Sequence, residues 1–492
     1  MTDLRADRPG WKDWLPLLVV LAVFGALCFT NLGAYALMNW DESEYASLGR
    51  SMLHMDGYKI SEKPNFMRPP WWPASIAAVM WAAGDETEQT AKIATVLYSL
   101  LAIALVYWGV WVECGRVPAA FAGWSLAICP EFTTRAVSLL SEQAFLALHL
   151  AALLSFYFAF RGREKWFYAG WLFWSLSFST RYTGLLFGPL LVIIFLYESV
   201  RDRGLLKRLL RTRDFWLSPI AAGVILAPWY LRQWRSFGDP LIGVKRAAGQ
   251  IPSYSNEHMP WHFYFSEMPD AMTLPIAALA VAGLLHGVAI AKRPLAVYLT
   301  VGAAIIYGWH MQYDYKEVRL AAPALPLLTM GVGLAVKAWM DFTAGRRWLG
   351  RTAVLALMAI SSIQGVGAIR HEFRERQSTG ETAFLQAIEH IRQSMAKDIV
   401  LVGVKQPQIY WYSDRETLRS PRRKPQYRQR LSEADWVVIT SYERSPPPYL
   451  TPVFEEMKTA EWFGEGGRVF RHSGHQVLIA RPEWVLDQIA DD

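Results

Sequence analysis

Long apolar runs recur along the chain and constrain its fold more than any other feature. A run of about 20 mostly apolar residues is long enough to cross a bilayer as an α-helix. Eleven runs of this kind alternate with polar loops, and the third and fifth are short for a span. They cover residues 14–37, 91–112, 117–130, 141–160, 166–180, 182–199, 215–231, 271–291, 295–311, 318–340 and 352–369. The sequence therefore predicts a mainly α-helical, polytopic membrane protein with about 11, in the range 11 to 13, transmembrane helices.

Basic residues gather in alternate loops, and this pattern predicts the orientation of the spans, because cytoplasmic loops carry an excess of Lys and Arg. Residues 71–84 are apolar but short, and counting them as a span would place the basic loops outside. They are therefore interpreted as a helix along the outer interface. The N-terminus has basic residues and no small-residue cleavage site, so it is expected in the cytoplasm. The loops 38–90 and 232–270, the turn 312–317 and the tail 371–492 are then expected outside.

The tail, residues 371–492, is polar and mixed, and it predicts a small α/β domain that follows a membrane domain of residues 1–370. Phe384, Ile388, Ile391 and Met395 recur at helical spacing. Short apolar runs at 399–404, 436–440 and 476–479 are typical of buried strands. The tail contains no cysteine, so no disulfide is expected there.

Charge and motifs exclude several classes of function. The net charge of +7 lies mostly in the loops expected in the cytoplasm, so it indicates topology and gives no reason to expect nucleic acid as a partner. The chain has no G-x-x-x-x-G-K-[ST], H-E-x-x-H or C-x-x-C motif, which argues against an ATP-driven pump.

Charged residues beside the outer helix ends are the candidates for chemistry. Asp41 and Glu42 follow the first span, and capping of the next helix by Asp41 is the alternative to a catalytic role. Lys63 and Arg68 flank a proline-rigid turn that suits a phosphate at headgroup level, although snorkelling onto lipid phosphates would use the same residues.

Two further outer segments carry charges. The turn 313–320 contains Lys316 and Arg319, which either serve a site or form an internal network with the carboxylate between them. His258, in the loop 232–270, has a side chain suited to metal binding or proton transfer. Glu142, with Arg135 nearby, opens a later span, where a carboxylate also caps a helix.

Together these segments resemble the GT-C class of membrane glycosyltransferases, in the branch that contains protein O-mannosyltransferases and the lipid A aminoarabinose transferase. Four motifs occur in the order of that class. They are the pair Asp41-Glu42 with Tyr45-Ala46 after it, the turn Glu62-Lys63-Pro64, Glu142 at the start of a later span, and Lys316-Glu317-x-Arg319 before Pro323 and Pro326. Residues 179–189 also resemble a family segment, with Arg181 where Lys is common, whereas Asn65 replaces the usual second proline of the turn. The resemblance covers about residues 10–370.

The resemblance implies a polyprenyl-phosphate sugar as donor and inverting transfer outside the cytoplasmic membrane of a prokaryote. In this scheme Asp41 acts as the base with Glu42 beside it, and cations stabilise the departing phosphate. The expected phosphate-binding residues are Lys63, Arg68, Lys316 and Arg319, and further site candidates are Glu142, Arg135, Tyr45 and Arg181. A divalent metal held by Glu62 and His258 is compatible with the family, whereas no nucleotide or redox cofactor is expected. The expected partners are the lipid donor, membrane lipid and an acceptor glycolipid, glycan or protein.

Two other hypotheses remain open at this point. A polytopic transporter or flippase of lipid-linked sugars would usually place ionisable residues in the middle of the bilayer, whereas here they gather at one surface. A non-catalytic assembly protein with a similar fold would have no need of the acidic pair and the lysine.

Overall fold

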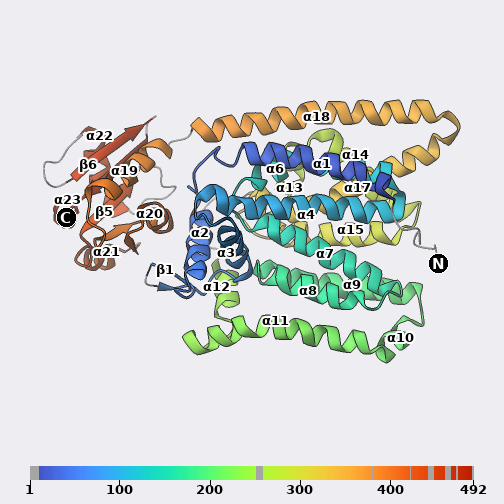
Figure 1. Cartoon of the computed structure of the whole chain (residues 1–492), viewed down its shortest axis with the longest axis horizontal. Coiled ribbons are helices and arrows are strands. Elements are labelled where there is room, and N and C mark those ends of the chain that lie inside the picture. Colours follow the sequence, from blue (N-terminus) through green and yellow to red (C-terminus); the bar gives the residue numbers. More distant parts are fainter. Residues whose placement is uncertain are drawn as a thin grey trace. The chain divides into compact units, whose positions relative to one another are not determined.

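The computed structural model describes residues 10–61, 63–250, 259–378, 381–421, 423–441, 448–459, 467–472 and 475–489. The chain divides into two compact units, and Figure 1 shows its helices and strands coloured along the sequence. Unit 1 comprises Met1–Leu32, Phe66–Ser75 and Lys92–Phe373, and unit 2 comprises Gly33–Asn65, Ile76–Ala91 and Arg374–Asp492. Unit 2 therefore combines the segment that follows the first span with the C-terminal tail.

Helices dominate the chain as far as residue 378. In chain order they are α1 (Trp11–Thr30), α2 (Trp40–Leu53), α3 (Trp71–Ala83), α4 (Glu88–Cys114), α5 (Arg116–Ala127), α6 (Pro130–Ala136), α7 (Glu142–Phe160), α8 (Trp166–Phe178), η1 (Tyr182–Leu186), α9 (Phe187–Arg201), α10 (Leu205–Arg211), α11 (Arg213–Phe237), α12 (Ile242–Gln250), α13 (Phe263–Met272), α14 (Leu274–Ala289), α15 (Pro294–Met311), α16 (Val318–Ala321), η3 (Ala322–Ala324), α17 (Leu325–Phe342), η4 (Ala344–Arg346) and α18 (Arg347–Ser378). The strands β1 (Lys59–Ile60) and β2 (Lys63–Pro64) form a short antiparallel hairpin.

Eight helices in the described part of the chain are long and apolar enough to span a membrane, and the bent pair α13 and α14 raises the number to nine. These helices confirm the polytopic, mainly α-helical fold. Two of the eleven expected spans form helices of only 12 and 13 residues, α5 and α8, so the number eleven stays a prediction. Residues 71–84 form the short helix α3, as expected for a segment that does not span, and its place at the interface also stays a prediction.

Close backbone approach holds α14 against α17 in unit 1. Gly283 of α14 lies so near α17 that an added Cβ atom would collide with the carbonyl oxygen of Gly331. A Cβ on Gly331 would in turn lie 2.6 Å from the carbonyl oxygen of Ala280. Small residues allow transmembrane helices to pack at this distance, where van der Waals contact drives their association. The same helix α17 also packs against α5 and α15.

The C-terminal tail forms an α/β domain within unit 2, as the sequence predicted. Its strands are β3 (Val400–Gly403), β4 (Glu416–Arg419), β5 (Trp436–Thr440), β6 (Gly467–His472) and β7 (His475–Ala480). The sheet has the order β4-β3-β5-β7-β6, with parallel pairing on the β4 side and antiparallel pairing on the β6 side. The remaining helices are α19 (Glu381–Ser394), α20 (Gln406–Ser413), α21 (Lys424–Leu431), η5 (Pro448–Leu450), α22 (Thr451–Thr459) and α23 (Pro482–Gln488).

Apolar side chains fill the space on either side of this sheet. One cluster joins Phe384, Ile388 and Ile391 of α19 to strand residues such as Leu401 and Val477. A second cluster joins the other strand positions to α21, α22 and α23. The helical spacing found in the sequence therefore marks the buried face of α19.

Substitution of Gly283 by alanine is expected to force α14 and α17 apart. Overpacking of a tight contact costs typically about 1–3 kcal/mol, so Gly283→Ala should unfold in detergent at a measurably lower temperature than the wild type. Gly223→Ala is the matched control, because nothing lies within 4 Å of a Cβ atom placed there in α11. Equal melting temperatures for the two variants would contradict the packing described.

Candidate active site

The acidic pair lies at the start of α2, and the helix is capped without using Asp41. The side chain of Asn39 accepts a hydrogen bond from the backbone N–H of Asp41 at 3.1 Å. Glu42 completes the capping box by accepting from the Asn39 N–H at 3.3 Å. Glu42 is buried, whereas Asp41 is half-buried. Asn39 is thus the N-cap residue, and the capping role considered for Asp41 is wrong.

Helix α20 of the tail domain contacts the chain before and after this acidic pair. The hydroxyl of Tyr412 accepts from the backbone N–H of Leu37 at 2.6 Å and donates to a carboxylate oxygen of Glu88. Gln408 donates from Nε2 to the carbonyl of Met38 at 3.0 Å. Burial, together with the negative charge of Glu88, raises the pKa of Tyr412, so its hydroxyl stays protonated and able to donate.

The other end of α2 is held by the same helix. The guanidinium of Arg50 lies 3.8 Å from the ring centroid of Trp411 and donates to the Trp411 carbonyl at 3.4 Å. The same arginine forms an ion pair with Glu86 at 3.2 Å. No local pattern in the sequence signals the contacts between Arg50 and Trp411, because these residues lie 361 positions apart.

The hairpin β1–β2 presents Lys63 beside α2. Asn65 donates from Nδ2 to Glu44 of α2 at 2.8 Å, which joins the end of the hairpin to the helix. The hydroxyl of Ser61 accepts from the backbone N–H of Thr417 at 3.4 Å, which joins the hairpin to β4. Lys63 itself is exposed, and Tyr45, the other candidate of this segment, is buried within α2.

In unit 1, the start of α7 carries a buried ion pair. Glu142 is 2% exposed and accepts from Nη1 of Arg181 at 2.8 Å. The same nitrogen of Arg181 donates to the hydroxyl of Ser141 at 3.1 Å. Removing one partner of a buried pair leaves an uncompensated charge, so the two residues depend on each other. The structure thus brings together two candidates that the sequence separates by 39 positions.

Four more charged side chains of unit 1 surround this pair. Arg135 of α6 donates to Glu131 at 2.9 Å, and its charge also interacts with those of Arg319 and Glu142. Arg319 in turn pairs with Glu317. The candidates Arg135, Glu142 and Arg319 therefore belong to one group of alternating charges. Glu131 was not predicted from the sequence, although a carboxylate four residues before an arginine on a helix is a recognisable signal of an ion pair such as that with Arg135.

Lys316 holds the turn between α15 and α16 together. Its ammonium group donates to the carbonyl of Met259 at 2.9 Å and to the carbonyl of Tyr313. The backbone N–H of Met259 donates back to the carbonyl of Asp314 at 3.2 Å. Lys316 is 3% exposed, so at least part of its hydrogen-bonding capacity serves the turn itself.

The segment that carries Arg68 is fixed within unit 1. The carbonyl of Phe66 accepts from the hydroxyl of Tyr182 at 3.4 Å, and the ring of Phe66 meets that of Phe237 edge-on. Arg68 is half-buried. The segment then leads into α3, whose first backbone N–H donates to the carbonyl of Ser179 at 2.9 Å.

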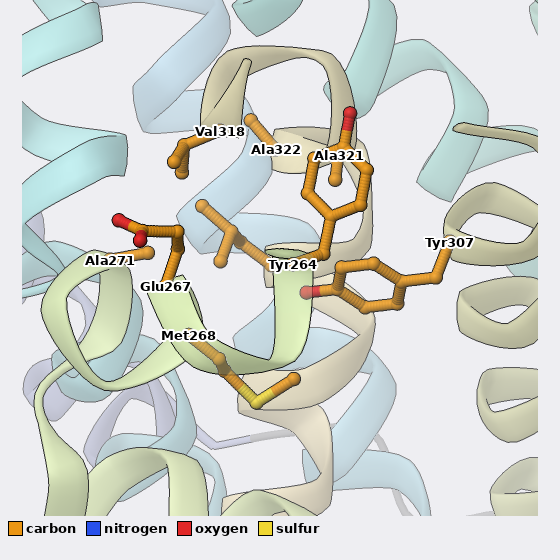
Figure 2. A pocket seen from close by; sticks show the side chains of 9 residues that line it. Tyr264, Glu267, Met268, Ala271, Tyr307, Val318, Ala321 and Ala322 are labelled. Carbon is orange, nitrogen blue, oxygen red and sulfur yellow. The ribbon is translucent and has the colours of Figure 1, made fainter. Parts of the chain in front are cut away.

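A small pocket lies in unit 1 among α13, α15 and the helices that follow the turn 313–320. Figure 2 shows the rings of Tyr264 and Tyr307 on one side of the pocket and the carboxylate of Glu267 on the other. Most of the remaining lining is aliphatic, with Val318, Ala321 and Ala322 supplied by the segment that begins at the basic turn.

The site candidates thus fall into two groups, one in each unit. Asp41, Glu42, Tyr45 and Lys63 lie in unit 2, and the group of Glu142 lies in unit 1 with Arg68 and Lys316. Glu62 and His258 lie outside the described residues. Within the described part of the chain, no group of three or more His, Cys, Asp or Glu side chains could hold a metal ion, so the metal site stays a prediction.

Comparison with known proteins places this geometry in context. Residues 67–231 match a family profile described as dolichyl-phosphate-mannose-protein mannosyltransferase. No curated protein matches the chain in sequence. Among solved structures, ArnT from Cupriavidus metallidurans bound to undecaprenyl phosphate is 18% identical, with a TM-score of 0.74 over 98% of this chain and 100% of that chain. The chain has the GT-C fold.

More distant GT-C structures agree with this assignment. The archaeal oligosaccharyltransferase AglB from Archaeoglobus fulgidus, in complex with an inhibitory peptide and a dolichol-phosphate, is 11% identical, with a TM-score of 0.61 over 96% of this chain and 75% of that chain. An Archaeoglobus fulgidus oligosaccharyltransferase in complex with Zn and sulfate gives 12% identity and a TM-score of 0.61 over 95% of this chain and 73% of that chain. The resemblance carried by the four sequence motifs is therefore confirmed at the level of the fold.

Loss of Arg181 is expected to destabilise the GT-C fold strongly. Arg181→Ala removes the cation 2.8 Å from the buried carboxylate of Glu142, and breaking a buried ion pair costs about 3–5 kcal/mol, so the variant should lose its native state at a much lower temperature in detergent. Arg208→Ala is the control, because its ion pair with Asp202 has the same 2.8 Å length but is largely exposed. Equal effects of the two substitutions would show that the Glu142 pair is solvated.

Loss of the Tyr412 hydroxyl is expected to loosen the chain just before α2. Tyr412→Phe leaves the N–H of Leu37 without its acceptor, at a cost of about 1–3 kcal/mol, and hydrogen exchange should become faster at that amide. Tyr449→Phe is the control, because it removes another partly buried hydrogen bond of unit 2, from the Tyr449 hydroxyl to the carbonyl of Pro421. It should leave hydrogen exchange at the Leu37 amide unchanged. Unchanged hydrogen exchange at the Leu37 amide in Tyr412→Phe would contradict an anchoring role for the Tyr412 hydroxyl.

Proposed function

We propose that the chain is a multi-pass glycosyltransferase of a prokaryotic cytoplasmic membrane that transfers a sugar from a polyprenyl phosphate to an acceptor outside that membrane. The proposal is supported by the fold shared with ArnT, which was solved with bound undecaprenyl phosphate, and with AglB, which was solved with a dolichol-phosphate and a peptide. It is also supported by the family profile over residues 67–231, whose description names a dolichyl-phosphate-mannose donor.

The state of Asp41 is the observation that carries this proposal furthest. Helix α2 is already capped by Asn39 and Glu42, so the local backbone does not require a carboxylate at position 41. Asp41 is nevertheless half-buried at the first turn, on a helix that the tail domain holds at both ends. A carboxylate fixed in this way suits a general base, which must lie within hydrogen-bonding reach of the proton that it removes.

In the proposed reaction, the acceptor hydroxyl gives its proton to the carboxylate of Asp41 as its oxygen attacks the anomeric carbon of the sugar. The bond between that carbon and the phosphate oxygen breaks, and the electron pair leaves with the polyprenyl phosphate. Because attack and departure occur on opposite faces of the sugar, the anomeric configuration inverts. Glu42, buried in the capping box, keeps the start of α2 in place.

The departing phosphate gains charge in the transition state, and cations assigned to it lower that barrier electrostatically. Lys63, Arg68 and Arg319 are proposed as phosphate ligands, as the resemblance of their motifs implies. Lys316 is assigned to orient the turn that precedes Arg319, since it donates to two backbone carbonyls there. Glu142 and Arg181 support the same segment of unit 1 through their buried ion pair.

Replacement of Asp41 by asparagine is expected to abolish sugar transfer while the protein still folds. Loss of a general base lowers the rate by about 10²–10⁴-fold. The measurement is transfer from a radiolabelled undecaprenyl-phosphate sugar in proteoliposomes, together with binding of undecaprenyl phosphate to the purified variant. Binding should stay close to that of the wild type, because asparagine preserves the shape of the side chain.

Asp56→Asn is the matched control, because Asp56 is an exposed carboxylate just after the same helix. That variant should transfer sugar at the rate of the wild type. Full activity of Asp41→Asn would remove Asp41 from the mechanism, and absence of transfer by the wild type from any polyprenyl-phosphate sugar would reject the proposed function.

A further inference from the structure

Arg419 of the tail domain lies beside the segment of the acidic pair. We propose that Arg419, together with Lys63, binds a phosphate group of a substrate beside the start of α2. The inference deepens the proposed function and rests on it for the nature of the substrates. It is carried by three contacts within unit 2 that place Arg419 against the residue before Asp41.

The first contact fixes the strand that carries Arg419. Strand β4 is joined to the hairpin β1–β2 by the hydrogen bond from the N–H of Thr417 to the hydroxyl of Ser61 at 3.4 Å. Arg419 follows Thr417 by two residues on this strand. Lys63 follows Ser61 by the same interval along the hairpin. Both cations therefore lie just beyond the place where the two segments meet.

The second contact fixes the guanidinium itself. The carbon Cζ of Arg419 lies 4.6 Å from the ring centroid of Trp40, which is the first residue of α2 and the neighbour of Asp41. Stacking on an aromatic face orients the planar guanidinium and leaves its N–H groups along the edge available for hydrogen bonds. Arg419 remains exposed, so a substrate from solvent or from the membrane surface can reach it.

The third set of contacts joins β4 to α20, and α20 to the chain before α2. Gln406 of α20 donates from Nε2 to the carbonyl of Thr417 at 2.7 Å, which joins α20 to β4. The same helix holds the chain before α2 through Tyr412 and Gln408. The position of Arg419 relative to Trp40 is thus set by a connected series of hydrogen bonds, and not by one flexible side chain.

The local charges call for an anion. In the part of the chain that the structure describes, neither Lys63 nor Arg419 forms an ion pair with a carboxylate. The charges of Arg430 and Arg419 act unfavourably on that of Lys63, and Glu433 offsets part of this repulsion. Arg430 is itself paired with Glu433. Two cations that repel each other are stabilised by an anionic group placed between them.

A phosphate matches this arrangement, because its oxygens are arranged tetrahedrally and a guanidinium fork and an ammonium group can bind them from different sides. Two substrates of the proposed reaction can supply that group. One is the polyprenyl-phosphate donor, and the other is an acceptor that carries its own phosphate. The chemistry at Arg419 is the same in both cases, so the experiment has to separate them.

The test measures phosphate binding by the full-length protein in nanodiscs at low ionic strength. The first arm titrates undecaprenyl phosphate, and the second arm titrates inorganic pyrophosphate onto protein already saturated with undecaprenyl phosphate. Arg419→Ala removes charge-assisted hydrogen bonds and is expected to weaken one of the two affinities about tenfold. Arg419→Lys should recover only part of the loss, because it keeps the charge but lacks the fork.

Arg481→Ala is the matched control. Arg481 lies over the ring of Trp436 at 4.1 Å in the same domain, so the control removes an equal charge and a similar stacking contact. It should leave both affinities unchanged. In a double-mutant cycle, Lys63→Ala and Arg419→Ala should be less than additive, because both residues bind the same group. A melting curve of each variant shows whether the domain remains folded.

Weakening in the first arm assigns the phosphate to the donor, and weakening in the second arm alone assigns it to an acceptor. Affinities within twofold of the control in both arms overturn the inference, and so does a wild type that binds neither probe. If the wild type transfers sugar while Arg419→Ala changes neither affinity, the inference fails and the proposed function stands. If Arg419→Ala weakens binding but no sugar is transferred, the phosphate site stands and the proposed function fails.

Discussion

A bilayer interior offers no water to backbone N–H and C=O groups or to charged side chains, and most of this molecule follows from that constraint. Helices satisfy their own backbone, so the long apolar runs become helices that pack through small residues such as Gly283 and Gly331. Buried charges are tolerated when they pair, as Glu142 and Arg181 do at the start of α7. Chemistry that needs ionised groups is therefore pushed to the helix ends and to the segments that connect them.

The sequence was sufficient to predict the elements whose residues repeat with a clear period. The long apolar runs, the buried face of α19 and the strand β5 all appear where the pattern placed them. Strands β4 and β6 were missed, because each lies at an edge of the sheet and carries polar residues among its apolar ones. Helices α5 and α8 are shorter than a bilayer is thick, and hydropathy alone does not decide how such helices are used.

The site was predictable in its residue types and much less in its contacts. Asp41 and Glu42 stood out because two carboxylates follow an apolar run, but only the structure shows that Asn39 caps the helix. The pairing of Glu142 with Arg181 needed the fold to bring α7 near η1. Arg419 and Tyr412 were invisible as partners of this segment, since no local pattern links a tail domain to a loop near the N-terminus. Long-range contacts of this kind depend on tertiary packing, which periodicity does not encode.

The hydrogen bonds between α20 and the chain before α2 also determine when that segment becomes fixed during synthesis of the protein. The ribosome makes Leu37 and Met38 long before Gln408 and Tyr412, which are about 370 residues later in the chain. Contacts between such distant segments form late, because the intervening chain must first be made and ordered. The start of α2 is therefore fixed only after the tail domain has folded. A chain that ends before α20 would carry Asp41 and Glu42 without the hydrogen bonds that hold the segment before α2.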